Sequence, residues 1–270
     1  MRSSPIASEP SSSMSERLSG KVAVVTGIGS GIGRGCALRF ASEGAFVIGT
    51  DINGLAAERT VQDARDQGFV VSSIHPLDLT VPLDVAHFLA EATHGRDSID
   101  VLVNAGAIEP RMATTELMDF ETEWRPTIAG ELDLVFLACQ AAWPYLKASG
   151  SSSIINFASV NSFRGSRHLG MVAHTAGKGA VLSMTRQLAI EGGPFGIRAN
   201  TIAPGLVQTG ATAAAGATTG PVAEALSART LLGRLGVPDD IAWCATYLAS
   251  DEAKWVTGAN FTIDGGVTAA

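Results

Sequence analysis

Residues 22–33 read Val-Ala-Val-Val-Thr-Gly-Ile-Gly-Ser-Gly-Ile-Gly. Four apolar, mostly β-branched residues open the stretch and indicate a buried parallel strand. The glycines follow at once, and a helical pattern continues from Arg34 to Glu43. A strand that passes through a glycine turn into a helix N-terminus favours phosphate, because free backbone N–H groups and the helix dipole both attract an anion. The stretch predicts a dinucleotide-binding turn; the alternative is an ordinary glycine-rich βα turn.

The residues of this turn have distinct expected roles. Gly27 permits the tight turn, Gly31 allows close approach of a pyrophosphate, and Gly33 lets the helix pack closely on the strand. Ser30 and Ile32 stand beside these glycines and belong to the same expected cofactor-binding stretch.

A second apolar run, residues 45–50, ends at Asp51. This acid lies roughly 20 residues beyond the glycine turn, where a carboxylate reaches the adenosine ribose hydroxyls of a dinucleotide. A carboxylate there repels a 2′-phosphate, and neither Ile52 nor Asn53 supplies a compensating cation. The predicted cofactor is therefore NAD rather than NADP. An alternative role for Asp51 is the N-cap of a helix that begins near Gly54.

The composition predicts one large α/β domain. The chain has 270 residues, of which 46% are hydrophobic, enough for a well-filled core. The net charge of −7 is spread along the chain, which argues against a nucleic-acid surface. No apolar run approaches the ~18 residues that span a bilayer, so we expect a soluble protein.

The cysteines and the N-terminal residues indicate in which cellular compartment the protein is expected. Cys36, Cys139 and Cys244 fall in apolar helical patterns at unrelated spacings, which is typical of buried packing thiols in a reducing cytoplasm. Residues 1–18 are rich in Ser and lack the apolar centre of a secretory signal. We expect a disordered tail there, followed by a single domain at 19–270.

Strand and helix patterns alternate along the rest of the chain. This alternation predicts a doubly wound parallel sheet flanked by helices, with the ligand at the carboxyl ends of the strands. Later strands are expected at residues 69–74, 100–103, 154–158, 197–202 and 260–263. Helices are expected at residues 54–67, 82–93, 116–149 with a break near Pro126, 170–191 and 238–250. Residues 207–220 lack a period and suit a mobile lid.

Two strand ends supply further candidate cofactor contacts. Asp78 follows the third strand, where it touches the adenine or is simply a solvated loop acid. Asn104, Ala105 and Gly106 follow the fourth strand, and their small size lets the backbone pass close to the cofactor's ribose.

From about Leu18 to Val267 the chain resembles the short-chain dehydrogenase/reductase family. The matching pieces are Thr26–Gly33, Asp51, Asp78, Asn104–Gly106, Ser159, Lys178, Pro204-Gly205 and residues 256–266. The resemblance implies a Rossmann-type sheet of about seven strands, with Pro204 and Gly205 beside the cofactor. It also implies a homo-oligomer, a dimer or tetramer, paired through residues 132–149 and 170–191.

In this family an Asn, a Ser, a Tyr and a Lys form the reaction centre. The Ser steadies the substrate oxygen, the Tyr exchanges a proton with it, and the Lys binds the nicotinamide ribose. Ser159 and Lys178 match two of these positions. The Tyr position, four residues before Lys178, holds His174, and counting back from Val135-Phe136-Leu137 places Glu131 at the Asn position.

The chemistry of His174 is compatible with the Tyr role. Residues four apart share a helix face, so His174 and Lys178 would point the same way. A neutral imidazole is a competent general base towards an alcohol, and an imidazolium is a competent acid. Glu131 would orient the imidazole or pair with Lys178. An imidazole is shorter than a phenol, so it reaches the substrate oxygen less readily, in part through a water.

Three functions follow as hypotheses. The first is an NAD-dependent oxidoreductase acting on a small-molecule secondary alcohol or ketone. The second is a non-redox lyase or isomerase that uses His174 and Glu131 for acid–base work. The third is a silent cofactor-binding subunit in a mixed oligomer, in which His174 marks a lost activity.

Several candidate site residues also have structural interpretations that involve no ligand. Ser159 is alternatively a strand-end cap, and Lys178 a solvated helix lysine. The remaining histidines show no metal-ligand spacing, so we expect no metal site. The segments expected around the substrate are largely apolar but contain four charged residues: Glu109, Arg111, Arg164 and Arg167. A substrate that carries an anionic substituent is therefore compatible with the sequence.

Overall fold

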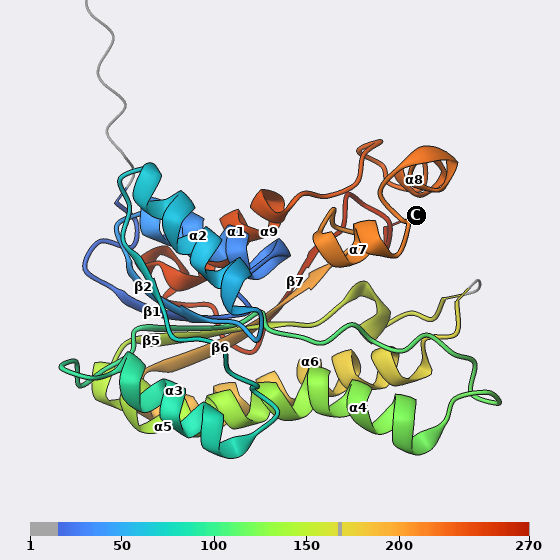
Figure 1. The fold of residues 1–270 in the computed structure, drawn as a ribbon. Helices are drawn as coiled ribbons and strands as arrows, with labels where there is room; N and C mark the ends of the chain where they lie inside the picture. Colours follow the sequence, from blue (N-terminus) through green and yellow to red (C-terminus); the bar gives the residue numbers. More distant parts are fainter. Residues whose placement is uncertain (1–15, 167–168, 270) are drawn as a thin grey trace, which may run out of the picture.

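The computed structural model describes residues 16–166 and 169–269, which form a seven-stranded parallel sheet between two layers of helices (Figure 1). The strand order is β3-β2-β1-β4-β5-β6-β7. The strands are β1 (Val22–Thr26), β2 (Phe46–Thr50), β3 (Val71–Ser73), β4 (Val101–Asn104), β5 (Ser152–Phe157), β6 (Ile197–Pro204) and β7 (Asn260–Ile263). The doubly wound Rossmann-type sheet predicted from the sequence is confirmed.

Helices cover both faces of the sheet (Figure 1). One layer contains α1 (Gly31–Ser42), α2 (Gly54–Asp66) and α9 (Pro238–Ala249). The other contains α3 (Pro82–Ala92), α4 (Arg125–Ile128), α5 (Leu134–Ser149) and α6 (Val172–Gly192). Two short helices, α7 (Gly210–Ala214) and α8 (Gly220–Ser227), follow the carboxyl end of β6.

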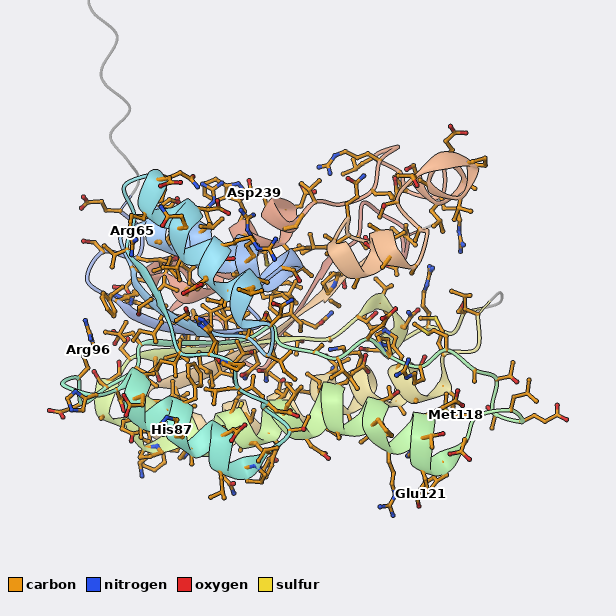
Figure 2. All side chains as sticks on the ribbon, in the orientation of Figure 1. Arg65, His87, Arg96, Met118, Glu121 and Asp239 are labelled. Carbon is orange, nitrogen blue, oxygen red and sulfur yellow. The ribbon has the colours of Figure 1, made fainter. Side chains whose placement is uncertain are left out.

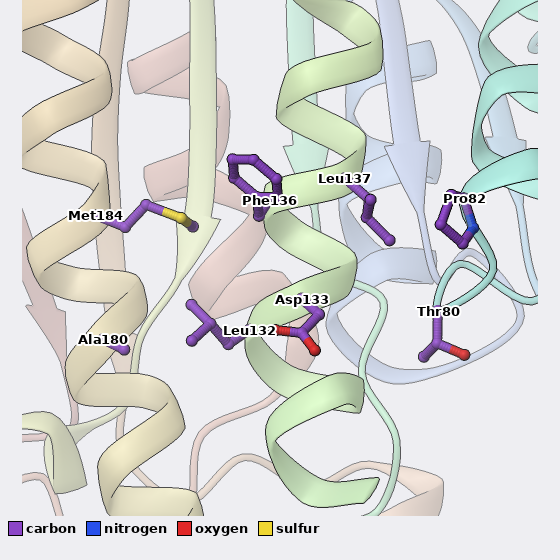
Figure 3. Close-up of a pocket in the computed structure, with 8 residues that line it drawn as sticks. All are labelled: Thr80, Pro82, Leu132, Asp133, Phe136, Leu137, Ala180 and Met184. Atoms are coloured by element: carbon purple, nitrogen blue, oxygen red, sulfur yellow. The ribbon is translucent and has the colours of Figure 1, made fainter. Parts of the chain in front are cut away.

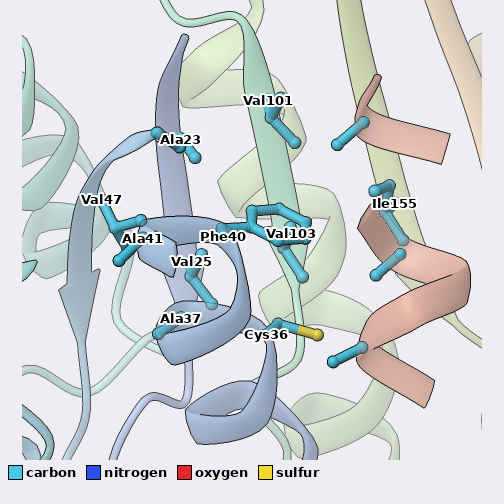
Figure 4. Packing of buried hydrophobic residues seen from close by; sticks show 14 of the residues in the cluster. Ala23, Val25, Cys36, Ala37, Phe40, Ala41, Val47, Val101, Val103 and Ile155 are labelled. Carbon is cyan, nitrogen blue, oxygen red and sulfur yellow. The ribbon is translucent and has the colours of Figure 1, made fainter. Parts of the chain in front are cut away.

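Two apolar clusters hold the layers together. In the first, Phe40 and Ala37 of α1 pack on Val25 and Val103 of the sheet, and α9 closes the cluster (Figure 4). In the second, α3, α5 and α6 pack on the opposite face around residues such as Phe88. With both faces of the central strands buried, β1, β2 and β4 are mostly apolar and do not alternate, as is typical of parallel strands.

The register brings three strand ends to one point. Thr26 of β1 pairs in register with Thr50 of β2 on one side and with Asn104 of β4 on the other. The strand order reverses between β1 and β4, which makes this the switch point where an open α/β sheet leaves a crevice for a ligand.

The predicted helix break near Pro126 is wrong. Residues 120–149 are continuously helical, because π-helical segments at Phe120–Trp124 and Ala129–Asp133 flank α4 and lead into α5. Pro126 is the second residue of α4 and lacks the N–H that would donate to the preceding turn. The wider π turn before it, in which the Trp124 N–H donates to the Asp119 carbonyl at 3.0 Å, accommodates the ring.

Residues 207–220, for which the sequence suggested a mobile lid rather than a packed helix, contain the short helix α7 and the start of α8. None of the residues of α7 is buried. Thr209 caps α7, because its Oγ1 accepts the Thr212 N–H at 3.2 Å and Thr212 Oγ1 accepts the Thr209 N–H at 2.8 Å. A helix of five residues is too short to show a period, so the capping residues were its only signal.

The expected N-terminal tail lies outside the described residues up to position 15. Leu18 is fully buried, and its N–H donates to the Glu43 carbonyl at 2.9 Å. Arg17 forms an ion pair with Glu252 at 2.7 Å. Packing on the domain therefore includes residues before 19.

Candidate active site

The glycine turn after β1 touches the segment after β4. Gly27 has φ +73°, and a Cβ there would lie 2.7 Å from Gly106 Cα. The Gly106 N–H donates to Thr26 Oγ1 at 2.9 Å. The two strand ends are thus in backbone contact, which leaves no space for a side chain at Gly27.

The start of α1 suits an anion. Ser30 is its N-cap but makes no side-chain hydrogen bond to the first turn, and no acidic residue stands in that turn. The N–H groups of Gly31, Ile32 and Gly33 therefore lack a capping side chain within the described chain, and the helix dipole adds positive potential there. A dinucleotide phosphate fits this terminus. At Gly33 a Cβ would collide with the Gly27 carbonyl, so only glycine allows the helix this close to the strand.

Asp51 is held beside the same turn. Its Oδ2 accepts the Gly29 N–H at 2.8 Å, and its Oδ1 accepts the Asn53 N–H at 2.8 Å. The N-cap of α2 is Asn53, which accepts the Ala56 N–H at 3.1 Å, so the alternative role of Asp51 as that cap is wrong. The carboxylate therefore stands at the end of β2, next to the glycine turn.

Asp78 and Asn104 are both committed to internal hydrogen bonds. Asp78 Oδ1 accepts from the Thr80 N–H at 2.9 Å and from Thr80 Oγ1 at 2.7 Å. Asn104 is buried, and its Nδ2 donates to Asn156 Oδ1 at 2.8 Å and to Cys139 Sγ at 3.3 Å. The Asn104 side chain thus links β4 to β5 and α5, and the backbone of Ala105 and Gly106 is left to line the crevice.

Pro204 and Gly205 end β6 against the C-terminal turn. A Cβ at Gly205 would lie 2.9 Å from Asp264 Cα. Thr209, which sequence reasoning did not single out, lies over the glycine turn: a Cβ at Gly31 would be 3.1 Å from Thr209 Cγ2. Its signal in the sequence was the pair Thr209 and Thr212 of the capping box.

His174 and Glu131 form a buried dyad. His174 Nδ1 lies 2.5 Å from Glu131 Oε1, and the Glu131 side chain is 1% exposed. Glu131 Oε2 is buried without a hydrogen-bond partner in the described chain. Glu131 belongs to the second π segment, whose extra residue turns it towards α6. A carboxylate at this distance from Nδ1 fixes the tautomer with the proton on Nδ1, which leaves Nε2 as an acceptor.

Lys178 lies one turn after His174 on α6 and is 9% exposed. Burial lowers the pKa of Lys178, because the charged ammonium loses solvent, and the Glu131 carboxylate acts in the opposite direction. Glu131 therefore serves two side chains of this helix face, as hydrogen-bond acceptor for His174 and as counter-charge for Lys178.

Ser159 ends β5 and begins a short 3₁₀ turn, Val160–Ser162. Its Oγ accepts the Asn161 N–H at 3.1 Å, and its own N–H donates to Ser162 Oγ at 3.1 Å. The capping role considered for Ser159 is therefore real. It uses a lone pair of Oγ and leaves the hydroxyl proton for a ligand.

The other arginines named in the sequence analysis are not all brought to the dyad. Arg164 Nη1 donates to the Val267 carbonyl at 3.1 Å, whereas Arg111 is exposed. Arg167 and His168 lie outside the described residues. Within the described ranges no group of three or more His, Cys, Asp or Glu side chains is placed to share a metal ion. No described helix has the length and hydropathy needed to cross a membrane.

Comparison with known proteins shows what the chain is similar to. Residues 27–268 match the family model described as "Enoyl-(Acyl carrier protein) reductase". The chain is 37% identical to 2,5-dichloro-2,5-cyclohexadiene-1,4-diol dehydrogenase of Sphingobium indicum, over 94% of this chain and 98% of that protein. It is 34% identical to an NAD-dependent glycerol dehydrogenase of Listeria innocua, over 92% and 94% respectively. The crystal structure of a gluconate 5-dehydrogenase from Burkholderia cenocepacia, in complex with NADP and tartrate, superimposes with a TM-score of 0.86 at 31% identity, covering 95% and 98%.

Two glycines of α6 test how Glu131 is held. A Cβ at Gly177 would lie 2.9 Å from Glu131 Oε2, whereas one at Gly179 would meet only Ser162 O at 3.8 Å. Alanine in a helix interior is worth about 0.5–1 kcal/mol over glycine. We expect Gly179→Ala to raise the free energy of unfolding by that amount. Gly177→Ala should not be stabilised, because its methyl group displaces the Glu131 carboxylate, and it should shift the ¹⁵N resonances of the His174 ring. Equal stabilisation with unchanged His174 resonances in both variants would contradict this packing.

Proposed function

Since the chain belongs to the short-chain dehydrogenase/reductase family, we propose that it is an NAD-dependent oxidoreductase acting on secondary alcohols or their ketones. Ser159, His174 and Lys178 form the reaction centre, and Glu131 positions His174. The observation that carries this proposal is the 2.5 Å contact between His174 Nδ1 and Glu131 Oε1 on the helix face that also presents Lys178.

The residues present fit a dinucleotide. The uncapped first turn of α1 binds the phosphates, Asp51 binds the adenosine ribose, and Asp78 lies near the adenine. The backbone of Asn104, Ala105 and Gly106, together with Pro204 and Gly205, lines the nicotinamide half. Lys178 binds the nicotinamide ribose. NAD, when bound, supplies the hydride acceptor for the alcohol carbon.

The protein groups handle the proton. Ser159 Oγ–H donates to the substrate oxygen and holds it in place. His174 Nε2 takes the hydroxyl proton as general base, and in the reverse direction the imidazolium returns it to the ketone oxygen. Glu131 keeps the Nδ1 proton in place and stabilises the imidazolium that forms.

The same dyad also fits a second function. An oriented His–Glu pair is sufficient for proton abstraction and return without any hydride transfer, as a lyase or isomerase requires. The discriminating observation is turnover after the nicotinamide nucleotide has been removed. Purified protein given NAD and a broad panel of secondary alcohols should form reduced nicotinamide; no signal across the panel, with NAD binding intact, overturns the oxidoreductase proposal.

Variants of the dyad test the role of His174. Removing a general base costs roughly 10²–10⁴-fold in rate, so we expect His174→Ala to lower kcat by that range without changing the Kd for NAD. His174→Tyr alone should also lose activity, because the phenol meets the buried Glu131 carboxylate. The double variant His174→Tyr/Glu131→Asn should recover part of it, since contacting residues are coupled. His87→Ala, an exposed histidine on α3 (Figure 2), is the matched control. Full activity in His174→Ala contradicts the assignment.

Asp51 supports NAD over NADP. We expect Asp51→Asn, which keeps an acceptor for the Gly29 N–H, to relieve the repulsion of a 2′-phosphate and weaken the ribose bond. A hydrogen bond to a charged group is worth about 1.5–3 kcal/mol, so the ratio of kcat/KM for NADP to that for NAD should rise at least tenfold. Steady-state kinetics with both cofactors measures the ratio. An unchanged ratio, or wild-type protein that prefers NADP, refutes the role of Asp51.

We further propose a homo-oligomer, a dimer or tetramer, paired through α5 and α6. A groove of about 550 Å³ lies on this outer face. Its lining includes Leu132 of the π segment before α5, Phe136 of α5, and Ala180 and Met184 of α6 (Figure 3). Phe136 is 48% exposed, as an apolar contact residue is in a free subunit. The location we propose is the cytoplasm, since Cys36, Cys139 and Cys244 are free thiols.

A charge in this groove should separate the subunits. We expect Phe136→Glu to reduce the sedimentation coefficient to that of a smaller species, because a second copy would bury the new carboxylate. Leu55→Glu, at a side chain 72% exposed on α2 in the opposite layer, is the control. Sedimentation velocity of the wild type and the two variants measures the oligomeric state. A monomeric wild type, or an oligomer that persists in Phe136→Glu, excludes this interface.

A further inference from the structure

The segments that follow β4, β5 and β6 present apolar side chains to solvent. All three leave the same edge of the sheet, because the strands are parallel. We call the following residues the apolar rim: Ile108, Met112, Phe163, Leu169, Leu231 and Leu232. Their exposed fractions run from 36% for Ile108 to 69% for Leu232. Single exposed apolar residues are ordinary, but a contiguous set marks a binding surface.

Close contacts connect the segments that carry the rim. A Cβ at Gly170 would collide with the backbone of Ala113, so the segments after β4 and β5 lie against each other. Arg164 then joins the segment after β5 to the C-terminal turn through the Val267 carbonyl. The N–H groups of Leu231 and Leu232 both donate to the Gly265 carbonyl of that turn, at 2.8 and 3.2 Å. The rim is thus assembled by backbone contacts.

The rim borders the dyad. Leu169 is five residues before His174, and the segment that carries it runs directly into α6. Asn161 of the 3₁₀ turn after Ser159 reaches the same place, since its Nδ2 contacts Met171 Sδ at 3.7 Å. A molecule whose oxygen lies at Ser159 and His174 therefore places its remaining atoms at the rim.

Two charged side chains near the rim have partners within the protein. Asp264 accepts three hydrogen bonds, from the Gly266 N–H at 2.8 Å and from the Thr268 N–H and Oγ1 at 2.8 and 2.7 Å. Arg164 Nη1 donates to the Val267 carbonyl at 3.1 Å, whereas its Nε is buried without a hydrogen-bond partner in the described chain. Glu109 and Arg111, next to Ile108 and Met112, are exposed and can remain in water while an apolar body contacts the rim.

We propose that the substrate of the oxidoreductase is an alcohol with an apolar body, such as an alicyclic ring, and that the apolar rim binds this body. The inference rests on the proposed function and names the substrate class of the same site. Each methylene that the rim removes from water favours binding, and a pocket gains roughly tenfold in kcat/KM from one well-placed methylene.

A matched pair of alcohols tests the proposal. Cyclohexanol and tetrahydropyran-4-ol differ by one methylene replaced with an ether oxygen, and erythritol represents the polyols. With NAD, we expect kcat/KM for cyclohexanol to exceed that for tetrahydropyran-4-ol roughly tenfold, and erythritol to be the poorest. The double variant Met112→Ser/Leu169→Ser should raise KM for cyclohexanol about tenfold with kcat retained. Val70→Ser, exposed at the amino end of β3, is the control and should change neither constant.

The outcomes separate the two proposals. Turnover that favours erythritol, or a double variant that behaves as the control does, overturns the apolar-body assignment while the oxidoreductase stands. If no alcohol is turned over, the oxidoreductase proposal fails. Saturation-transfer NMR with NAD present then tests whether the rim binds cyclohexanol. Signal transfer to cyclohexanol that the double variant loses supports the rim as a binding surface; no transfer, or equal transfer in both proteins, overturns it.

Discussion

The contact between the turn after β1 and the segment after β4 is the constraint on which the site depends. Gly27 and Gly106 meet backbone to backbone, and Thr26 Oγ1 fastens them through the Gly106 N–H. This contact fixes the two strands between which the order of the sheet reverses. It also sets the start of α1, because Gly33 lies against the Gly27 carbonyl. The anion-binding terminus and the crevice are therefore placed by one arrangement of small residues.

Glu131 is the second constraint, because a carboxylate that is 1% exposed must be compensated. Its Oε1 is satisfied by His174, and Lys178 supplies the nearby positive charge. The π segment that carries Glu131 also turns the Gly130 carbonyl to the Ile108 N–H at 3.1 Å. The dyad is thereby joined to the segment after β4, and the two halves of the site are mechanically linked.

The sequence predicted the architecture well, because strand and glycine signals are local. The seven strands and the main helices lie close to where their apolar patterns placed them, and Asn260–Ile263 was matched to the residue. The error at Pro126 arose where the structure depends on π turns, and the short helix at Gly210–Ala214 was not foreseen because five capped residues show no period. The Glu131–His174 contact spans 43 positions, so an alignment could suggest it but no local pattern could show it. The internal bonds of Asn104 depend on β5 and α5 in the same way.

The two parts of the site have different physical requirements, and the fold supplies them from different elements. Proton transfer needs atoms held to a fraction of an ångström, and His174, Lys178 and Glu131 stand on helices whose faces are packed into the protein. Binding an apolar body needs surface area more than exact geometry, and the rim residues stand on loops. Under the function proposed above, a change of rim residues would alter which alcohol is bound without displacing the dyad. Chemistry and substrate choice would then be separable, because one depends on buried charge and the other on exposed apolar area.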